Sequence, residues 1–195
     1  MVDEIEFGRE FFTLLEQFDE GMVRRVAAGG CPRCEGPLHR SDFDRKPRGG
    51  VIALAGEEFR RRFSLCCGRE GCRKRATPPS VRFLGRRVYL GAVVIVASIV
   101  AVALQSAGEI RKRTGVPART TRRWLGWWQG PFMDTEVFVM IRARLIGVEV
   151  GRVPASIVDR LAGTPTERVQ GMLAWLLPLT TGSAPDGARF LRGIG

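Results

Sequence analysis

Five cysteines are the residues of this sequence best placed to do chemistry, because four of them have the spacing of a metal site. Cys31 and Cys34 form a C-x2-C pair, and after 31 intervening residues a second cluster holds Cys66, Cys67 and Cys72. Four thiolates in two tight turns are typical of a structural zinc site, in which each turn supplies two ligands of a tetrahedron. We therefore expect Zn²⁺ bound at this cluster.

The identity of the third ligand stays open in the sequence. Cys67 is the preferred ligand, with Cys66 facing the core, although Cys66 or His39 could take its place. A disulfide or a redox-active pair is the alternative chemistry, and the absence of a secretion signal disfavours it. The motif lacks the His and Glu pairing of hydrolytic zinc sites, so the zinc is expected to be structural. The predicted ligands are Cys31, Cys34, Cys67 and Cys72.

A small β ribbon must position these thiolates. Residues 38–43 and 59–66 have the composition of strands, and residues 44–50 have that of a loop between them. An amphipathic helix is expected before the ribbon, over residues 5–26, with an acidic first turn and with Gly29 and Gly30 at its end.

Positive charge is concentrated in the middle of the chain. The protein has 195 residues, a net charge of +11 and 31 basic residues, of which three are lysine. The net charge is −4 over residues 1–28, +9 over 29–87, +5 over 88–130 and +1 over 131–195. A basic block between less basic flanks is typical of a nucleic-acid-binding module, and arginine suits planar contacts with phosphates and base edges.

Residues 106–128 predict two short helices joined by a tight turn. Ser106 and Glu109 have the spacing of a capping box, Gly115 supplies a left-handed residue, and Pro117 begins the second helix. On the second helix, Thr121 and three apolar residues share one face and arginines occupy the other, as in a DNA-recognition helix. The face with the arginines holds Ala118, Arg119, Arg122 and Arg123.

The stretch GEIRKRTGVPARTTRRWL resembles the helix-turn-helix of bacterial resolvases and transposases. With the preceding zinc ribbon, it also resembles the N-terminal part of mobile-element proteins. The resemblance implies binding of double-stranded DNA, with Arg119 or Arg122 paired to guanine and the neighbouring residues on phosphates. The residues it places against DNA are Pro117, Ala118, Arg119, Thr120, Arg122 and Arg123. Further phosphate contacts are expected from the segment that joins the two modules, through Arg73, Lys74, Arg75, Arg82, Arg86 and Arg87.

Residues 88–104 form an uncharged apolar run with two possible explanations. We expect a buried core helix that supports the helix pair, because the run is shorter than a usual membrane span. A membrane-anchored zinc-ribbon protein, with residues 88–108 as its span, is the alternative.

The chain lacks the motifs of the common enzyme classes. No phosphate-binding loop, nucleophile elbow or Ser/His/Asp set is present, and removing residues 1–130 leaves too little chain for the carboxylate-bearing domain of a transposase. We therefore expect no enzymatic activity and no small-molecule substrate. Residues 131–195 predict helices near 132–146, 154–161 and 164–177, followed by a mobile tail over residues 180–195. These helices could form a homodimer.

The predicted fold is mainly α with a small β zinc ribbon, a helix-turn-helix bundle and C-terminal helices. Its expected divisions are an N-terminal helix (1–28), the ribbon with its basic linker (29–87), the DNA-binding domain (88–130) and the C-terminal region (131–195). The expected function is that of a cytoplasmic, nucleoid-associated targeting or regulatory component of a transposon, with chemistry carried by a separate transposase or integrase polypeptide. A transcription regulator unrelated to transposition, or an RNA-binding protein, is the alternative.

Overall fold

A computed structural model describes residues 7–45, 58–84, 90–104 and 106–181, and over these residues the protein is mainly helical with two small antiparallel sheets. The predicted fold class is confirmed to that extent. The elements up to the last strand are α1 (Arg9–Ala28), β1 (Leu38–Arg40), β2 (Phe43–Asp44), the 3-10 helix η2 (Glu58–Arg60), β3 (Arg61–Arg62), β4 (Leu65–Cys67) and β5 (Arg75–Ala76). The helices that follow are α3 (Gly91–Ala103), α4 (Ala107–Thr114), α5 (Ala118–Trp128), α6 (Glu136–Arg144), η3 (Val150–Arg152), α7 (Ala155–Val158), α8 (Pro165–Trp175) and η4 (Leu177–Leu179).

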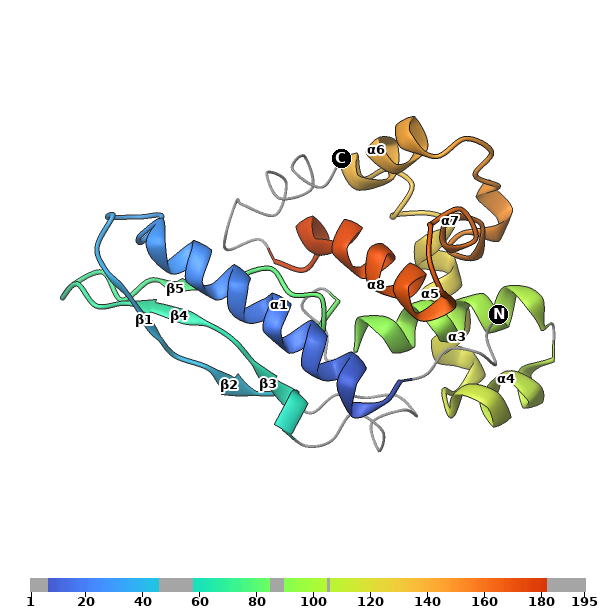
Figure 1. Cartoon of the computed structure of the whole chain (residues 1–195), viewed down its shortest axis with the longest axis horizontal. Coiled ribbons are helices and arrows are strands. Elements are labelled where there is room, and N and C mark those ends of the chain that lie inside the picture. Colours follow the sequence, from blue (N-terminus) through green and yellow to red (C-terminus); the bar gives the residue numbers. More distant parts are fainter. Residues whose placement is uncertain (1–6, 46–57, 85–89, 105, 182–195) are drawn as a thin grey trace.

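Helix α1 joins the sheets to the helical part of the molecule (Figure 1). Phe12 and Leu15, from its first half, lie in the larger hydrophobic core with the apolar residues of α3 and α8. Val23 and Val26, from its second half, lie in a smaller core with residues of β4 and β5. The predicted amphipathic helix is therefore confirmed, but it begins at Arg9 rather than at residue 5, after Gly8, whose backbone is extended. Residues 5 and 6 lie outside the described residues.

The predicted strands form a short, broken ribbon. Strand β4 lies between β1 and β5, and Leu38 pairs with Cys67 in an antiparallel register. The first expected strand is divided into β1 and β2, and the second begins with the η2 turn, continues as β3 and resumes as β4. The second sheet pairs β2 with β3. Most of the expected loop at 44–50 lies outside the described residues.

Helix α3 is the predicted core helix. Nine of its 13 residues are buried, and its neighbours include α4, α5 and α8. The single polar side chain buried on α3, Ser98, accepts a hydrogen bond of 3.0 Å from the indole Nε1 of Trp128 on α5. Within the described ranges, no helix combines the length and the apolar character needed to cross a membrane.

A buried ion-pair network ties α1 to the segment between β5 and α3. Asp19 accepts hydrogen bonds from the Ser80 hydroxyl, the Val81 amide and the Arg82 Nε at 2.6, 2.8 and 2.9 Å. The Arg82 side chain is fully buried and also pairs with Glu16 at 3.0 Å. The expectation that Arg82 contacts DNA is therefore wrong, because its guanidinium is used inside the protein.

Replacing Asp19 with alanine is expected to destabilise the fold by about 3–5 kcal/mol, because it leaves the Arg82 charge buried without its main partner. Urea unfolding followed by circular dichroism measures the change. Glu20→Ala is the matched control, since Glu20 pairs with Arg40 at the surface and should contribute at most about 1 kcal/mol. Equal losses for the two variants would contradict this account of the network.

The C-terminal helices agree with the sequence patterns in part. The capping box at the start of α8 is confirmed, with Thr164 and Glu167 each accepting a hydrogen bond from the other's backbone amide. Helix α6 begins later than expected, because Thr135 caps it, and α7 is shorter than expected. The mobile tail expected over residues 180–195 is wrong at its start, because Thr180 is buried and accepts a hydrogen bond of 2.9 Å from the Ser80 amide. Residues 182–195 lie outside the described residues.

The predicted capping box at the start of α4 is wrong, since the Ser106 side chain makes no capping bond and Glu109 instead pairs with Arg113.

Candidate metal centre and basic helix

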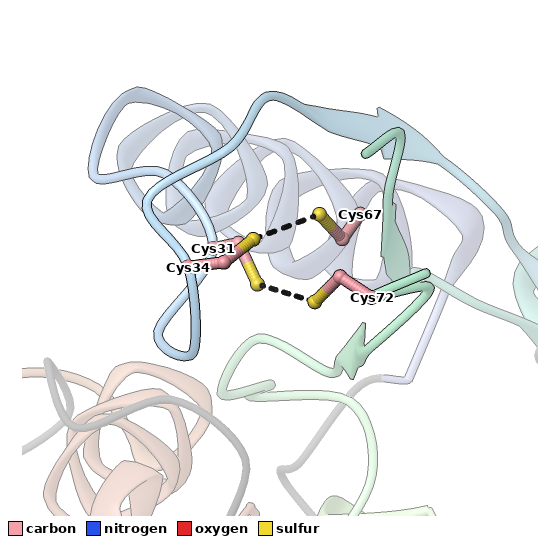
Figure 2. A group of neighbouring side chains, drawn as sticks. All are labelled: Cys31, Cys34, Cys67 and Cys72. Carbon is pink, nitrogen blue, oxygen red and sulfur yellow. Dashed lines mark hydrogen bonds between the residues drawn. The ribbon is translucent and has the colours of Figure 1, made fainter. Parts of the chain in front are cut away.

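The four cysteines expected as ligands lie together at the base of the ribbon. The Sγ atoms of Cys31, Cys34, Cys67 and Cys72 are all within 4.8 Å of one another. Figure 2 shows the pair from the first turn facing the pair from the second, with 3.8 Å between Cys31 and Cys72 and 3.5 Å between Cys34 and Cys67. Sulfurs at the corners of a tetrahedron with bonds of about 2.3 Å lie about 3.8 Å apart, so this group has the size of a metal site.

Local backbone geometry places both turns. The first turn follows α1 directly and is closed by hydrogen bonds between Cys31 and Gly36 and between Glu35 and Cys31. Gly36 has a specific role here, because a Cβ at this position would lie 3.3 Å from the sulfurs of Cys34 and Cys67. In the second turn, the Arg69 amide donates to the Cys67 Sγ at 3.4 Å, the kind of contact that stabilises a thiolate.

The structure excludes Cys66 and His39 from the group of four. The thiol of Cys66 points toward the Arg73 carbonyl oxygen at 3.5 Å, on the face of β4 opposite Leu65 and Cys67. Cys66 is half buried and does not belong to the small core, so its expected place in the ribbon core is wrong. His39 is exposed on β1 and lies against Gly68.

The cysteine pKa values differ because their surroundings differ. Hydrogen bonds from the backbone of Arg33, and then of Cys34, help to lower the pKa of Cys31 to about 7. Burial raises the pKa of Cys67 to about 12. In the metal-free protein Cys67 therefore keeps its proton at neutral pH, and a metal ion must displace that proton when it binds.

Helix α5 separates its side chains into two faces, as its sequence pattern predicts. Thr121, Trp124 and Trp128 are buried against the core. Its N-terminal part carries the predicted DNA-contact residues on the surface: Pro117, Arg119, Arg122 and Arg123 are exposed, and Ala118 and Thr120 are half buried.

The turn before α5 also has the expected conformation. Gly115 ends α4 with a φ of 65°, in the left-handed region that favours glycine. Val116 is fully buried and anchors the connection, and Pro117 is the N-terminal cap of α5. Arg111 and Lys112, in the last turn of α4, are exposed as well. These two residues are not among the predicted DNA contacts, although their place just before Gly115 indicates that they lie beside α5.

The basic residues of the ribbon are not brought together with those of α5. Strand β5 and helix α5 lie toward opposite ends of the long axis, with α1 between them (Figure 1). Arg73 and Lys74 are exposed. Arg75 is occupied by bonds to Ser41 and Ser64 and by a contact with the ring of Phe43. Arg86 and Arg87 lie outside the described residues.

The exposed basic side chains of the ribbon can balance the negative charge of the cysteine cluster. Four thiolates around a divalent metal carry a net charge of −2. Arg33 and Arg69 lie within the two turns, and Arg73 and Lys74 follow Cys72 directly. These four side chains can offset the charge of the cluster, so they favour DNA contact less strongly than the arginines of α5 do.

Comparison of the chain with protein-family models, with curated proteins and with solved structures found no match. The proposal below therefore depends on the residues and geometry described above.

Proposed function

We propose that this protein binds double-stranded DNA and inserts α5 into the major groove, as the second helix of a helix-turn-helix. The observation that carries the proposal is the division of α5 into a buried aromatic face and an exposed face with Arg119, Arg122 and Arg123. A short helix, a left-handed glycine and a second helix with a basic outer face are the parts that this motif requires.

The position of each residue along α5 indicates whether it would contact a base or a phosphate. Arg119 and Arg122 are exposed within its first one and a half turns, where recognition helices meet base edges, and a guanidinium can pair with the O6 and N7 atoms of guanine. Arg123, Thr120 and the backbone near Pro117 suit phosphate contacts that fix the register. Arg111 and Lys112 of α4 extend the positive surface beside them.

The ion at the cysteine cluster is proposed to be a structural zinc. Cys31, Cys34, Cys67 and Cys72 offer four soft thiolates at tetrahedral separations, which zinc favours over magnesium or calcium. Zinc would hold the two turns together at the end of α1. The ribbon would then give Arg73 and Lys74 a fixed position, from which they can add phosphate contacts.

The proposed biological role is that of a non-catalytic targeting or regulatory component of a transposon. This part rests on the resemblance of residues 108–125 to resolvase and transposase sequences. Transcription regulation is the second candidate, and it uses the same DNA-binding surface. A transposase or integrase reading frame beside the gene would support the first role over the second.

Competition binding tests the choice of nucleic acid. A labelled 30-base-pair DNA duplex of mixed sequence (a length of about three helical turns) is bound by zinc-loaded protein and followed by fluorescence anisotropy. Unlabelled duplex DNA is expected to displace the probe at lower concentration than structured RNA or single-stranded DNA. Stronger displacement by RNA would overturn the proposal in favour of an RNA-binding protein.

Zinc affinity is expected to fall with decreasing pH, and to fall more steeply below about pH 7. The buried Cys67 thiol gives up one proton at any pH below about 12 when zinc binds, so it contributes about one factor of ten per pH unit. Cys31 adds a second such factor only below its pKa of about 7. Zinc titration with a competing chelator at several pH values measures the slope, and an unchanged slope across pH 7 would contradict the assignment of Cys31.

A further inference from the structure

Helix α6 presents an exposed face that the proposed function does not use. Residues three and four apart on a helix share one side, which places Glu136, Val139, Arg142 and Ala143 together. All four are exposed, whereas Val137, Phe138 and Ile141 face the core. We refer to the exposed four as the α6 face.

Exposed large apolar side chains are concentrated in this stretch of the sequence. Over the described residues, four large apolar side chains are exposed, and three of them fall between positions 139 and 150. Val139 is 64% exposed at the middle of α6, and Ile146, just beyond the helix end, is 95% exposed. Burial of such side chains is favourable, so an exposed valine at the centre of the α6 face favours contact with a partner.

The charges of the α6 face are complementary to those of a second copy of the same face. Glu136 begins the helix and Arg142 lies near its end, and the described part of the chain offers neither a salt-bridge partner. In an antiparallel pairing of two α6 helices about a twofold axis at Val139, Glu136 of each copy lies opposite Arg142 of the other. The same axis places the two Val139 side chains against each other, so the face is self-complementary.

We propose that the protein forms a symmetric dimer through the α6 face, with α6 of a second copy packed antiparallel against it. The helix has nine residues and is about 13 Å long, so the contact is smaller than a standard specific interface, which buries about 1,600 Å². A weak dimer follows, with a dissociation constant on the order of 10 µM. This inference does not depend on the proposed DNA binding, although a twofold dimer would present two copies of α5.

Sedimentation velocity of the full-length, zinc-loaded chain over about 1–300 µM, a range that spans the expected dissociation constant, tests the proposal. A concentration-dependent shift from monomer to dimer is expected, and Val139→Asp should weaken the dimer at least tenfold (about 1.4 kcal/mol). Leu14→Asp is the matched control, because Leu14 is 51% exposed on α1, away from α6, and its replacement should leave the dimer unchanged.

Charge reversal distinguishes the antiparallel arrangement from other contacts. Glu136→Arg and Arg142→Glu, made singly, place like charges opposite each other twice and should weaken the dimer roughly tenfold. The double variant restores both pairs and should recover the dimer, even though it keeps the unfavourable charges at the two helix ends. A protein that is monomeric at every concentration, or a double variant that stays as weak as the single variants, would overturn the proposal.

Discussion

Replacing Cys67 with serine is expected to abolish stoichiometric zinc binding and to unfold the ribbon. Cys67 is fully buried among the other three sulfurs, and a serine hydroxyl is a poor ligand for a site built from thiolates. Structural zinc sites contribute about 10–16 kcal/mol of apparent binding energy in small zinc domains. The small core of the ribbon cannot replace a contribution of that size, since it consists of five buried side chains.

Zinc content by elemental analysis and thermal unfolding by circular dichroism measure this effect. One zinc per chain is expected for the unaltered protein and less than about 0.1 for Cys67→Ser. At a zinc concentration about ten times the dissociation constant of the unaltered protein, this corresponds to a loss of affinity of at least about 100-fold. Cys66→Ser is the matched control, because Cys66 is the adjacent residue and its thiol points away from the cluster. Loss of zinc from both variants, or from neither, would contradict the assignment of the ligands.

The second large effect is expected at α5. Replacing Arg119, Arg122 and Arg123 together with alanine should weaken binding to duplex DNA at least about 100-fold, because each arginine that contacts a base or a phosphate contributes about 1–3 kcal/mol. The fold should persist, since the side chains that attach α5 to the core, Trp124 and Trp128, are unchanged. Anisotropy at a fixed salt concentration measures the loss of affinity.

A second triple variant with the same change in net charge distinguishes direct contacts of α5 with DNA from the general electrostatic attraction of a basic protein to DNA. Arg9, Arg24 and Arg168 lie on α1 and α8, and their replacement with alanine also removes three positive charges. This variant should lose less than about tenfold in affinity, because general attraction is screened beyond about 10 Å. Equal losses for the two triple variants would show that α5 has no special role.

Features that depend on local sequence could be predicted well. The two cysteine turns follow from short spacings and from glycines beside them, and the structure brings the same four thiols together. The α4–α5 connection follows from Gly115 and Pro117, whose backbone preferences act over a few residues. The grouping of Cys67, rather than Cys66, with the other three thiols is confirmed, and it follows from the strand, whose alternate residues point to opposite faces.

Features that depend on distant partners could not be predicted in the same way. Arg82 resembles any other arginine of a basic segment, and its burial depends on Asp19, 63 residues away. The separation of β5 from α5 depends on how α1 spans the two cores, which charge counting does not report. The missing cap at Ser106 shows that a matching pair of residues is insufficient when the side chain can remain in solvent.

The salt dependence of DNA binding tests the central claim most directly. Binding of the unaltered protein and of the Arg119→Ala/Arg122→Ala/Arg123→Ala variant to one duplex is measured at about 50–300 mM salt, a range over which counterion release dominates. A steep linear decrease of log K with log salt is predicted for the unaltered protein, with a slope that is smaller by about one unit for each phosphate contact that the variant loses. Absence of binding by the unaltered protein, or identical slopes for the two proteins, would contradict the account.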